Sequence, residues 1–430
     1  MLAMQYQLER SQWWSPKTLL EQQFSQLRKL LTHAYDTVPF YRARLDAAGF
    51  NPQAELTPAR FAEIPLLRRQ DIQSAGVSLH SQKVPPDHGK VGNGITSGST
   101  GRPVQFLGTH LTSFLFRMFS LRDHLWHQRD LNGKLAIVRG ETKSEAHTGW
   151  GPSTDTIFKT GPCITEDIRT DVAVQVKWLQ EQNPDYLLSY PTNIRALAEI
   201  CLAKNIRLEN LREVRTLSET LNPEVREICR AAWGVPVVDM YTTSEVGYIA
   251  LQCPKHEHYH VQSEGVLVEV LNQENKPCRP GEIGRIVVTV LHNFAMPLIR
   301  YELMDYVELG ETCPCGRGLP VIKRILGRQR NLVTSPDGRR NWPMLGMKSF
   351  TEVAPIRQFQ VIQHSLEHIE MRLVMPRPLS PEEQVKCTAI LQKNLCYPFK
   401  ISFSYHDEIA RDANGKFEDF KSEVSQSVGT

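Results

Sequence analysis

Residues 186–190 read YLLSY, residues 214–217 read VRTL, and residues 235–241 read VPVVDMY. Each segment is short and apolar, which predicts a buried β-strand. Helical patterns alternate with these strands at 172–182, from Thr192 to Cys201, and from Pro223, behind the N-cap residue Asn222, to Gly234. Strands that alternate with helices favour a mostly parallel sheet with helical cover, so the fold class is α/β.

The pattern changes near residue 260. Residues 265–271 and 284–291 predict strands separated by turns, hence an antiparallel β subdomain. Beyond about residue 330, two strand patterns, a helix opened by the capping box Ser380–Glu383 and a last strand predict a compact α+β unit. We therefore expect a large N-terminal domain of residues 1–328, helical over about 1–90, and a small C-terminal domain of residues 329–430.

Composition narrows the class of protein. Of 430 residues, 41% are hydrophobic and 23% are charged, which excludes a disordered chain. The net charge of +3 gives no reason to expect nucleic acid or a membrane as partner. No apolar run approaches the roughly 18 residues of a spanning helix, and the first residues lack the features of a signal peptide. Nine cysteines, an odd number, predict a reducing compartment, so we expect a cytoplasmic protein.

A run of small and hydroxylic residues occupies positions 96–101, TSGSTG, ahead of Arg102 and Pro103. Successive backbone N–H groups in such a turn form a nest for an anion, and the hydroxyls add donors. The segment is not a Walker A loop, because no Gly-Lys-Ser/Thr follows it. Phosphate binding by Ser97, Gly98, Ser99, Thr100 and Gly101 is one interpretation, and an ordinary flexible loop is the alternative.

Two further segments carry polar groups at strand ends. Residues 241–245, YTTSE, follow a predicted parallel strand, where ligands of open α/β sheets bind. They offer an aromatic ring, hydroxyls and a carboxylate for Mg²⁺, although a helix cap is the alternative. Asp305 ends a rigid stretch and could accept from both ribose hydroxyls, while Arg300 could reach a phosphate. A surface turn with a salt bridge is the alternative there.

Cysteines and histidines are concentrated in two short segments, 253–260 and 313–315. Together they suit a tetrahedral structural Zn²⁺, although the C-x-C spacing is tighter than the common C-x₂-C. Free thiols with surface histidines are the alternative.

The order of these motifs resembles that of the adenylate-forming superfamily of acyl-coenzyme A synthetases, luciferases and nonribosomal peptide adenylation domains. Within it, the chain is most similar to the phenylacetate–coenzyme A ligase branch. The matching segments are 97–101, 241–245, 297–305, Gly327-Arg328 and Gly415-Lys416, with the N-terminal segment 31–41. The resemblance covers nearly the whole chain and implies a large ATP- and acid-binding domain followed by a small mobile domain.

The resemblance also implies a role for each matching position. Residues 97–101 would hold the triphosphate of ATP, Glu245 would bind Mg²⁺, and Asp305 would bind the ribose. The adenine would lie between Tyr241 and Ser218-Glu219-Thr220, with Thr242 and Thr243 also at the nucleotide. Arg328 would contact ribose or phosphate, Arg330 would stand at the domain hinge, and Lys416 would neutralise charge during adenylation. In the same branch a Cys-x-Cys binds zinc with upstream Cys and His, which implies Cys253, His260, Cys313 and Cys315, with His258 as the replacement for His260.

The implied activity is ATP-dependent conversion of a small, aryl or other, carboxylic acid into an acyl-adenylate. Transfer to a thiol of coenzyme A or of a carrier protein's phosphopantetheine would follow. Tyr190, Pro191 and Gly247 would border the acyl pocket, although routine packing explains them equally well. Nothing in the residues identifies the acid, and a homodimer is plausible for this branch.

Some residues depart from the superfamily pattern. Arg102 stands where a lysine is common, Met304 replaces the usual glycine before the ribose aspartate, and Gln329-Arg330 replace an acidic pair. Because methionine disfavours positive φ, we expect the turn at Met304 not to use it. These departures keep two alternatives open: a nucleotide-binding scaffold without turnover, and AMP transfer to a noncarboxylate metabolite with no thioester step.

Overall fold

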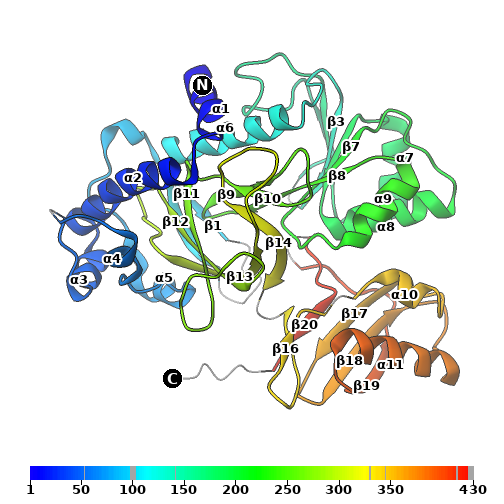
Figure 1. Cartoon of the computed structure of the whole chain (residues 1–430). Helices are drawn as coiled ribbons and strands as arrows, with labels where there is room; N and C mark the ends of the chain where they lie inside the picture. Colours follow the sequence, from blue (N-terminus) through cyan, green and yellow to red (C-terminus); the bar gives the residue numbers. More distant parts are fainter. Residues whose placement is uncertain are drawn as a thin grey trace.

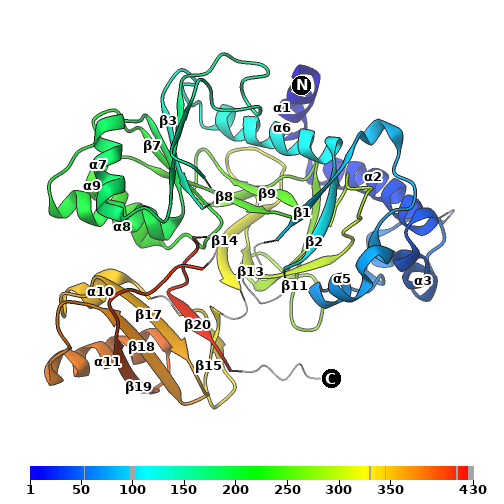
Figure 2. The same cartoon turned by 180° about the vertical axis from the view of Figure 1, so that it is seen from behind.

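A computed structural model describes residues 1–52, 54–96, 103–140, 142–328, 331–343, 345–412 and 415–424 (Figure 1). The described residues form a large part built on a twelve-stranded sheet and a small part built on a four-stranded sheet. Views from opposite sides show the small part packed beneath the large one (Figure 2). The expected boundary at residues 328 and 329 falls between the two sheets and stays a prediction. No helix among the described residues combines the length and apolarity needed to span a bilayer.

The parallel half of the large sheet confirms the α/β prediction. In sheet order its parallel strands are β8 (Val237–Thr243), β7 (Glu213–Leu217), β6 (Tyr186–Ser189), β3 (Leu135–Arg139) and β5 (Cys163–Asp167), with β4 (Glu145–His147) antiparallel at the edge. Helices α7 (Val172–Gln182), α8 (Pro191–Ala203) and α9 (Pro223–Trp233) lie together beside these strands (Figures 1 and 2). Asn222 caps α9 by accepting from the Glu224 N–H, as expected, whereas α8 begins behind Tyr190 and not at Thr192.

The antiparallel strands continue the same sheet. They are β9 (Gly247–Gln252), β10 (Tyr259–Val261), β14 (Val321–Arg328), β13 (Tyr301–Leu309), β12 (Ile283–Val290) and β11 (Val266–Leu271). The join is a hairpin in which β8 pairs antiparallel with β9, so that residues 244–246 form its turn. The alternative in which residues 241–245 cap a helix is therefore wrong.

The regular elements described within the first 90 residues are all α-helices or 3₁₀ turns. The elements are α1 (Leu2–Ser11), α2 (Pro16–Thr37), α3 (Pro39–Ala47), α4 (Pro58–Ala62), α5 (Arg69–Ala75) and the 3₁₀ turns η1 (Gly76–Leu79) and η2 (Pro86–His88). After them come the hairpin β1 (Val91–Ile95) and β2 (Gln105–Thr109) and the helix α6 (His110–Trp126).

Apolar residues at positions 20, 24, 27, 31 and 34 follow helical spacing and predict the buried face of α2, but the structure agrees with this prediction only in part. Leu27 and Leu31 are fully buried as the spacing indicates, but Leu20 is 40% exposed. Gln23 is buried instead, because its side-chain amide donates to the carbonyls of Ser263 and Val266 beside β11. A hydrophobic pattern cannot register a polar residue whose burial is offset by hydrogen bonds from another part of the chain.

The small part has its own core. Its sheet runs in the order β19 (Lys400–Tyr405), β18 (His368–Val374), β17 (Gln358–Gln363) and β20 (Phe420–Ser422). The short pair β15 (Val333–Thr334) and β16 (Arg340–Asn341) and the helices α10 (Met347–Thr351) and α11 (Pro381–Leu395) complete it. Ser380 and Glu383 form the expected capping box at the start of α11. Buried side chains such as Phe350, Phe359 and Leu391 supply a core separate from that of the large sheet.

Arg300 proves to be a structural residue. It is 4% exposed, forms an ion pair with Glu269 on β11 at 2.9 Å, and donates to the carbonyls of Ala62 and Ile64. It thus ties the N-terminal helices to the sheet, and the expectation that it could reach a phosphate is wrong.

Replacing Arg300 with leucine would leave the Glu269 carboxylate and two carbonyls without their donor. We expect the free energy of unfolding to fall by about 3 kcal/mol, as for other broken buried pairs. A urea titration followed by tryptophan fluorescence measures the loss. Lys177→Met is the control, because Lys177 and Glu181 are exposed and 3.9 Å apart; that change should cost roughly 0.5 kcal/mol or less. Equal losses for the two variants would contradict a structural role for Arg300.

Candidate active site

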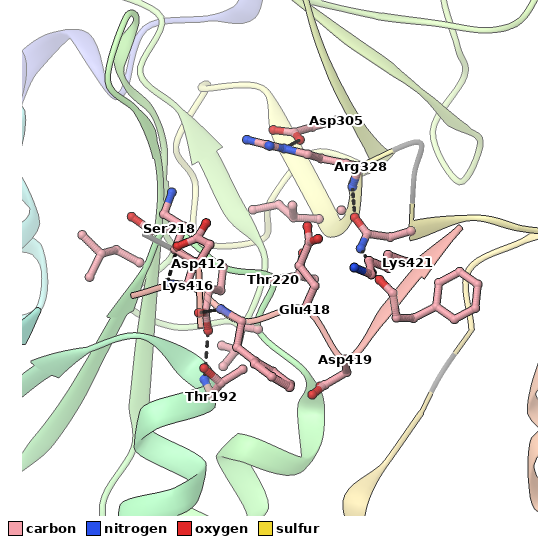
Figure 3. Close-up of a pocket in the computed structure, with 18 of the residues that line it drawn as sticks. Thr192, Ser218, Thr220, Asp305, Arg328, Asp412, Lys416, Glu418, Asp419 and Lys421 are labelled. Carbon is pink, nitrogen blue, oxygen red and sulfur yellow. Dashed lines mark hydrogen bonds and ion pairs between the residues drawn. The ribbon is translucent and has the colours of Figure 1, made fainter. Parts of the chain in front are cut away.

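A cavity of about 900 Å³ lies where the carboxyl ends of β7 and β8 face the small part. Strands β13 and β14 and the residues after β19 complete its wall. Figure 3 shows Asp305 and Arg328 of the large part at one side, and Lys416 and Asp412 of the small part near Ser218 at another. The cavity therefore collects ionisable groups from segments far apart in the sequence.

Residues 97–102, with the expected phosphate loop 97–101, lie outside the described residues. The frame that carries this segment is described. Thr96 and Val104 pair across its base, with the Thr96 N–H donating to the Val104 carbonyl and the Val104 N–H donating to Thr96 Oγ1, both at 2.9 Å. Arg69 on α5 also donates to Thr96 Oγ1 at 3.3 Å, which places a guanidinium at the base of the loop. Sequence reasoning missed Arg69, since nothing in its local pattern marks it.

Glu245 stands in the turn of the β8–β9 hairpin and lines the cavity. Its Oε1 accepts from the Tyr301 hydroxyl at 3.3 Å, and no other described side chain pairs with the carboxylate. Thr242, Thr243 and Ser244 line the same wall. The expected cluster of hydroxyls and a carboxylate is thus present at the end of β8.

Asp305 on β13 is held from two sides. The Tyr241 hydroxyl donates to Asp305 Oδ2 at 2.7 Å, and Arg328 Nε lies 3.5 Å from Oδ1. Burial, followed by the neighbouring Asp305 charge, raises the pKa of Tyr241 well above its usual value, so the phenol stays protonated and donates. A carboxylate fixed in this way can accept hydroxyl donors from a ligand in the cavity.

Two non-glycine residues of the cavity wall have left-handed backbone. Met304 has φ +64° and Ser218 has φ +69°, although neither is glycine. The expectation that the turn at Met304 avoids positive φ is therefore wrong. Antiparallel pairing of Asp305 with Arg328 on one strand and of Tyr301 with Val288 on the other fixes the chain on both sides of Met304. Such strain is characteristic of functional sites.

Lys416 enters the cavity on a loop of the small part. Its backbone N–H donates to Asp412 Oδ1 at 2.9 Å, while its side-chain amine has no partner among the described residues. Burial, and next the Arg328 guanidinium, lowers the pKa of Lys416 from its usual value, against the opposing charges of Asp412, Glu219 and Asp305. An amine without a partner in a half-buried cleft is available to a ligand.

The residues expected beside the adenine, 218–220, follow β7. Ser218, Glu219 and Thr220 all line the cavity, and the Glu219 carboxylate also accepts from the Phe417 N–H, beside Lys416, at 2.8 Å. Sequence reasoning missed Arg411 and Thr192, which meet beside Glu219. Arg411 lies only five residues before Lys416 in the chain. This closeness in sequence was the one signal that could have indicated Arg411 as a residue of the site.

The expected acyl-pocket residues lie outside the cavity wall. Tyr190 is 4% exposed beneath the loop of Gly415, and Pro191 is buried as the first residue of α8. Gly247 opens β9 with φ +85° next to Phe116. Phe116 itself lines the cavity while 44% exposed, packed on Tyr248 with ring centroids 4.8 Å apart. The structure thus offers Phe116 as an apolar wall that the sequence pattern did not indicate. Arg330, expected at the domain hinge, lies outside the described residues.

A second cluster lies away from the cavity. The ligand atoms of Cys253, His260, Cys313 and Cys315 all lie within 4.8 Å of one another. Two sulfurs at tetrahedral positions around Zn²⁺ lie about 3.8 Å apart, and a sulfur and an imidazole nitrogen about 3.6 Å. The Cys253–Cys313 separation is 3.9 Å and the His260–Cys315 separation is 3.4 Å. His258 Nε2 lies only 2.9 Å from Cys313 Sγ, which is shorter than the distance between two atoms that bind the same zinc ion. The geometry therefore favours His260 over His258 as the fourth ligand.

The chain is similar to known ligases along most of its length. Residues 344–423 match the sequence family described as the CapK C-terminal domain. A phenylacetate–coenzyme A ligase of Thermus thermophilus is 24% identical over 335 residues, which cover 72% of this chain and 70% of that protein. The resemblance to the phenylacetate–coenzyme A ligase branch of the adenylate-forming superfamily is thereby confirmed.

Solved structures confirm the fold. The crystal structure of 2-hydroxyisobutyryl-CoA ligase in its postadenylation state, in complex with R3-HIB-AMP, matches with a TM-score of 0.74 at 17% identity, covering 93% of this chain and 89% of that chain. The same ligase in its thioesterification state, with 2-HIB-AMP and CoA, matches with a TM-score of 0.61 at 18% identity over 94% and 89% of the two chains. The chain thus has the fold of adenylate-forming ligases.

The backbone at Met304 provides a test of the strained wall. Met304→Gly removes the side chain that disfavours positive φ, whereas Met304→Val adds β-branching that disfavours it more strongly. Since Met304 is 38% exposed, little burial is lost in either variant. We expect the glycine variant to be more stable to urea than the valine variant by about 2 kcal/mol. Equal stability would mean that the turn relaxes out of the left-handed region.

Proposed function

We propose that this protein activates a small carboxylic acid with ATP as an acyl-adenylate and then transfers the acyl group to the thiol of coenzyme A. The observation that carries this proposal is the convergence of Asp305, Arg328 and Glu245 from the large part with Lys416 from the small part on one cavity. The confirmed resemblance supports it, because the same four residue types stand at the matching motifs.

In the first step, a carboxylate oxygen of the acid attacks the α-phosphorus of ATP, and pyrophosphate leaves. Asp305, held by Tyr241 and Arg328, would accept from the ribose hydroxyls and so fix the nucleotide. Lys416 would donate to the negative charge that develops as acid and phosphate meet. Positioning and electrostatic stabilisation supply most of the catalysis in such a displacement.

In the second step, the thiol attacks the acyl carbon and expels AMP. Lys416 would leave the cavity with the small part, as in other enzymes whose domains move between steps. The TM-score is lower against the thioesterification state of 2-hydroxyisobutyryl-CoA ligase, 0.61, than against its postadenylation state, 0.74, which is compatible with a small domain placed differently in the two steps. A carrier-protein thiol is the alternative acceptor.

Glu245 would hold Mg²⁺, since its carboxylate lines the cavity and is engaged only by the Tyr301 hydroxyl among the described residues. When bound, the ion would neutralise phosphate charge. Residues 97–101, expected to hold the triphosphate, lie outside the described residues, but Thr96, directly before them, lines the same cavity.

The cysteine cluster would hold a structural Zn²⁺. Three sulfurs and one imidazole at separations close to those of a tetrahedron match the donor set of structural zinc sites. Such a site would fasten the β9–β10 turn to the segment before β14.

None of the nine cysteines forms a disulfide bond, which accords with the proposed cytoplasmic location.

The decisive experiment is substrate-dependent ATP–pyrophosphate exchange with a panel of aryl, hydroxy, amino and short aliphatic acids. We expect exchange with one class of acid. In Lys416→Ala the exchange rate should fall by orders of magnitude, because the mutation removes the positive charge that stabilises the transition state. Lys177→Met is the control, since Lys177 is exposed on α7. ATP binding with no exchange for any acid would contradict the proposal and favour the scaffold alternative.

Exchange that is followed by no consumption of coenzyme A would contradict only the second step. It would direct attention to a carrier protein or to AMP transfer onto another acceptor.

Metal analysis tests the zinc proposal. We expect about one zinc per chain in the purified protein, falling by most of its amount in Cys313→Ser, because a thiolate ligand is lost. Cys396→Ser is the matched control, as Cys396 is an exposed free thiol on the small part. The same zinc content in both variants would exclude Cys313 as a ligand.

A further inference from the structure

The Glu219 carboxylate lies between the two parts of the molecule. Glu219 follows β7, beyond the left-handed residue Ser218, and its side chain is 5% exposed. Its Oε2 accepts from the Thr192 N–H at 3.1 Å, in the first turn of α8. A helix N-terminus is a favourable place for an anion, so the large part fixes one carboxylate oxygen.

The other oxygen reaches the small part. Oε1 accepts from the Phe417 N–H at 2.8 Å and lies 3.8 Å from Arg411 Nη1. Phe417 directly follows Lys416 in the chain. One carboxylate therefore bridges the core of the large part and the backbone beside the candidate catalytic lysine.

Arg411 closes the same arrangement. Its Nη1 donates to Thr192 Oγ1 at 2.8 Å and to the Gly415 carbonyl at 3.1 Å. Gly415 has φ +78°, and a Cβ there would come within 2.4 Å of Ile168 Cγ2. The residues on both sides of Lys416 are thus held against the large part at short range.

Other contacts hold the small part without touching this loop. Arg195 on α8 pairs with Asp419 at 3.3 Å, and the Met347 N–H of α10 donates to Glu224 Oε2 at 2.9 Å. Docking of the small part therefore does not depend on Glu219 alone. Loss of the Glu219 charge should loosen the loop of Lys416 more than it separates the two parts.

We propose that Glu219 is a positioning residue that seats Lys416 in the cavity for the adenylation step. This inference rests on the proposed function. A carboxylate buried against two N–H groups and a guanidinium cannot be replaced by an amide without leaving some donor unpaired. An amide NH₂ directed at either N–H group would also be repelled.

The first test is Glu219→Gln in the full chain, with Glu181→Gln, an exposed carboxylate on α7, as the matched control. Hydrogen–deuterium exchange of a peptide containing Phe417 needs no knowledge of the acid. We expect exchange of this peptide to rise in Glu219→Gln and to stay unchanged in the control. Unchanged exchange in both variants would overturn the inference.

The second test separates the two half-reactions. With an acid that supports exchange, Glu219→Gln should lower the rate of ATP–pyrophosphate exchange roughly tenfold or more, while thioester formation from supplied acyl-adenylate changes much less. If Lys416→Ala abolishes exchange and Glu219→Gln does not reduce it, this inference fails alone. If Lys416→Ala leaves exchange intact, the proposed function itself fails.

A pH profile distinguishes positioning from general damage. The groups that face Lys416 are Arg328 from β14, Asp305 from β13, Glu219 beyond β7, and Asp412 on its own loop. The Glu219 charge favours the protonated form of the Lys416 amine. Without this charge, the adenylation rate should begin to fall at a lower pH on the alkaline side of its pH profile. Glu219→Asp keeps the negative charge, so its adenylation rate should fall at the same alkaline pH as in the wild type, even if the rate is lower throughout. A uniformly lower profile in Glu219→Gln, with no shift in the alkaline pH at which the rate falls, would contradict the proposed influence on Lys416.

Discussion

The antiparallel pairing of β8 with β9 is the constraint on which the position of every candidate catalytic group of the large part depends. This hairpin turns a parallel sheet into an antiparallel one, so the end of β8 lies at the middle of one continuous sheet and not at its border. Tyr241 on β8 can then reach Asp305 on β13, which is distant in sequence. Glu245, in the hairpin turn, is carried to the same wall. Without that join, the side chains expected to face the nucleotide would belong to two separate surfaces.

Polar and charged contacts hold the small part against the cavity of the large part. The Glu219 carboxylate of the large part accepts from the Phe417 N–H of the small part, and the Thr192 hydroxyl accepts from Arg411. Arg195 pairs with Asp419 nearby. These polar contacts are compatible with reversible docking, because interfaces between domains that move are more polar than a core. A lysine delivered by such an interface can be present in one step and absent in the next.

Much of the fold could be predicted, because periodicity and caps are local. The alternation over residues 172–241 and the capping box at Ser380 appear as expected. What failed depends on long-range contacts. Gln23 and Arg300 are buried because distant carbonyls and Glu269 satisfy them, and Met304 takes positive φ because strand pairing on both sides fixes it. In the candidate site, motif order indicated Asp305, Glu245 and Lys416, but no local signal revealed Phe116 or the orientation of Glu219.

The central claim is that a carboxylate attacks the α-phosphorus of ATP in this cavity. The most direct measurement uses a pooled panel of acids labelled with oxygen-18 in the carboxylate, together with ATP and coenzyme A, and follows the label by mass spectrometry. Attack on the α-phosphorus leaves one labelled oxygen on the AMP that the thiol later expels, so the account predicts AMP carrying a single oxygen-18. Turnover that releases unlabelled AMP, or that produces ADP and labelled phosphate, would contradict it.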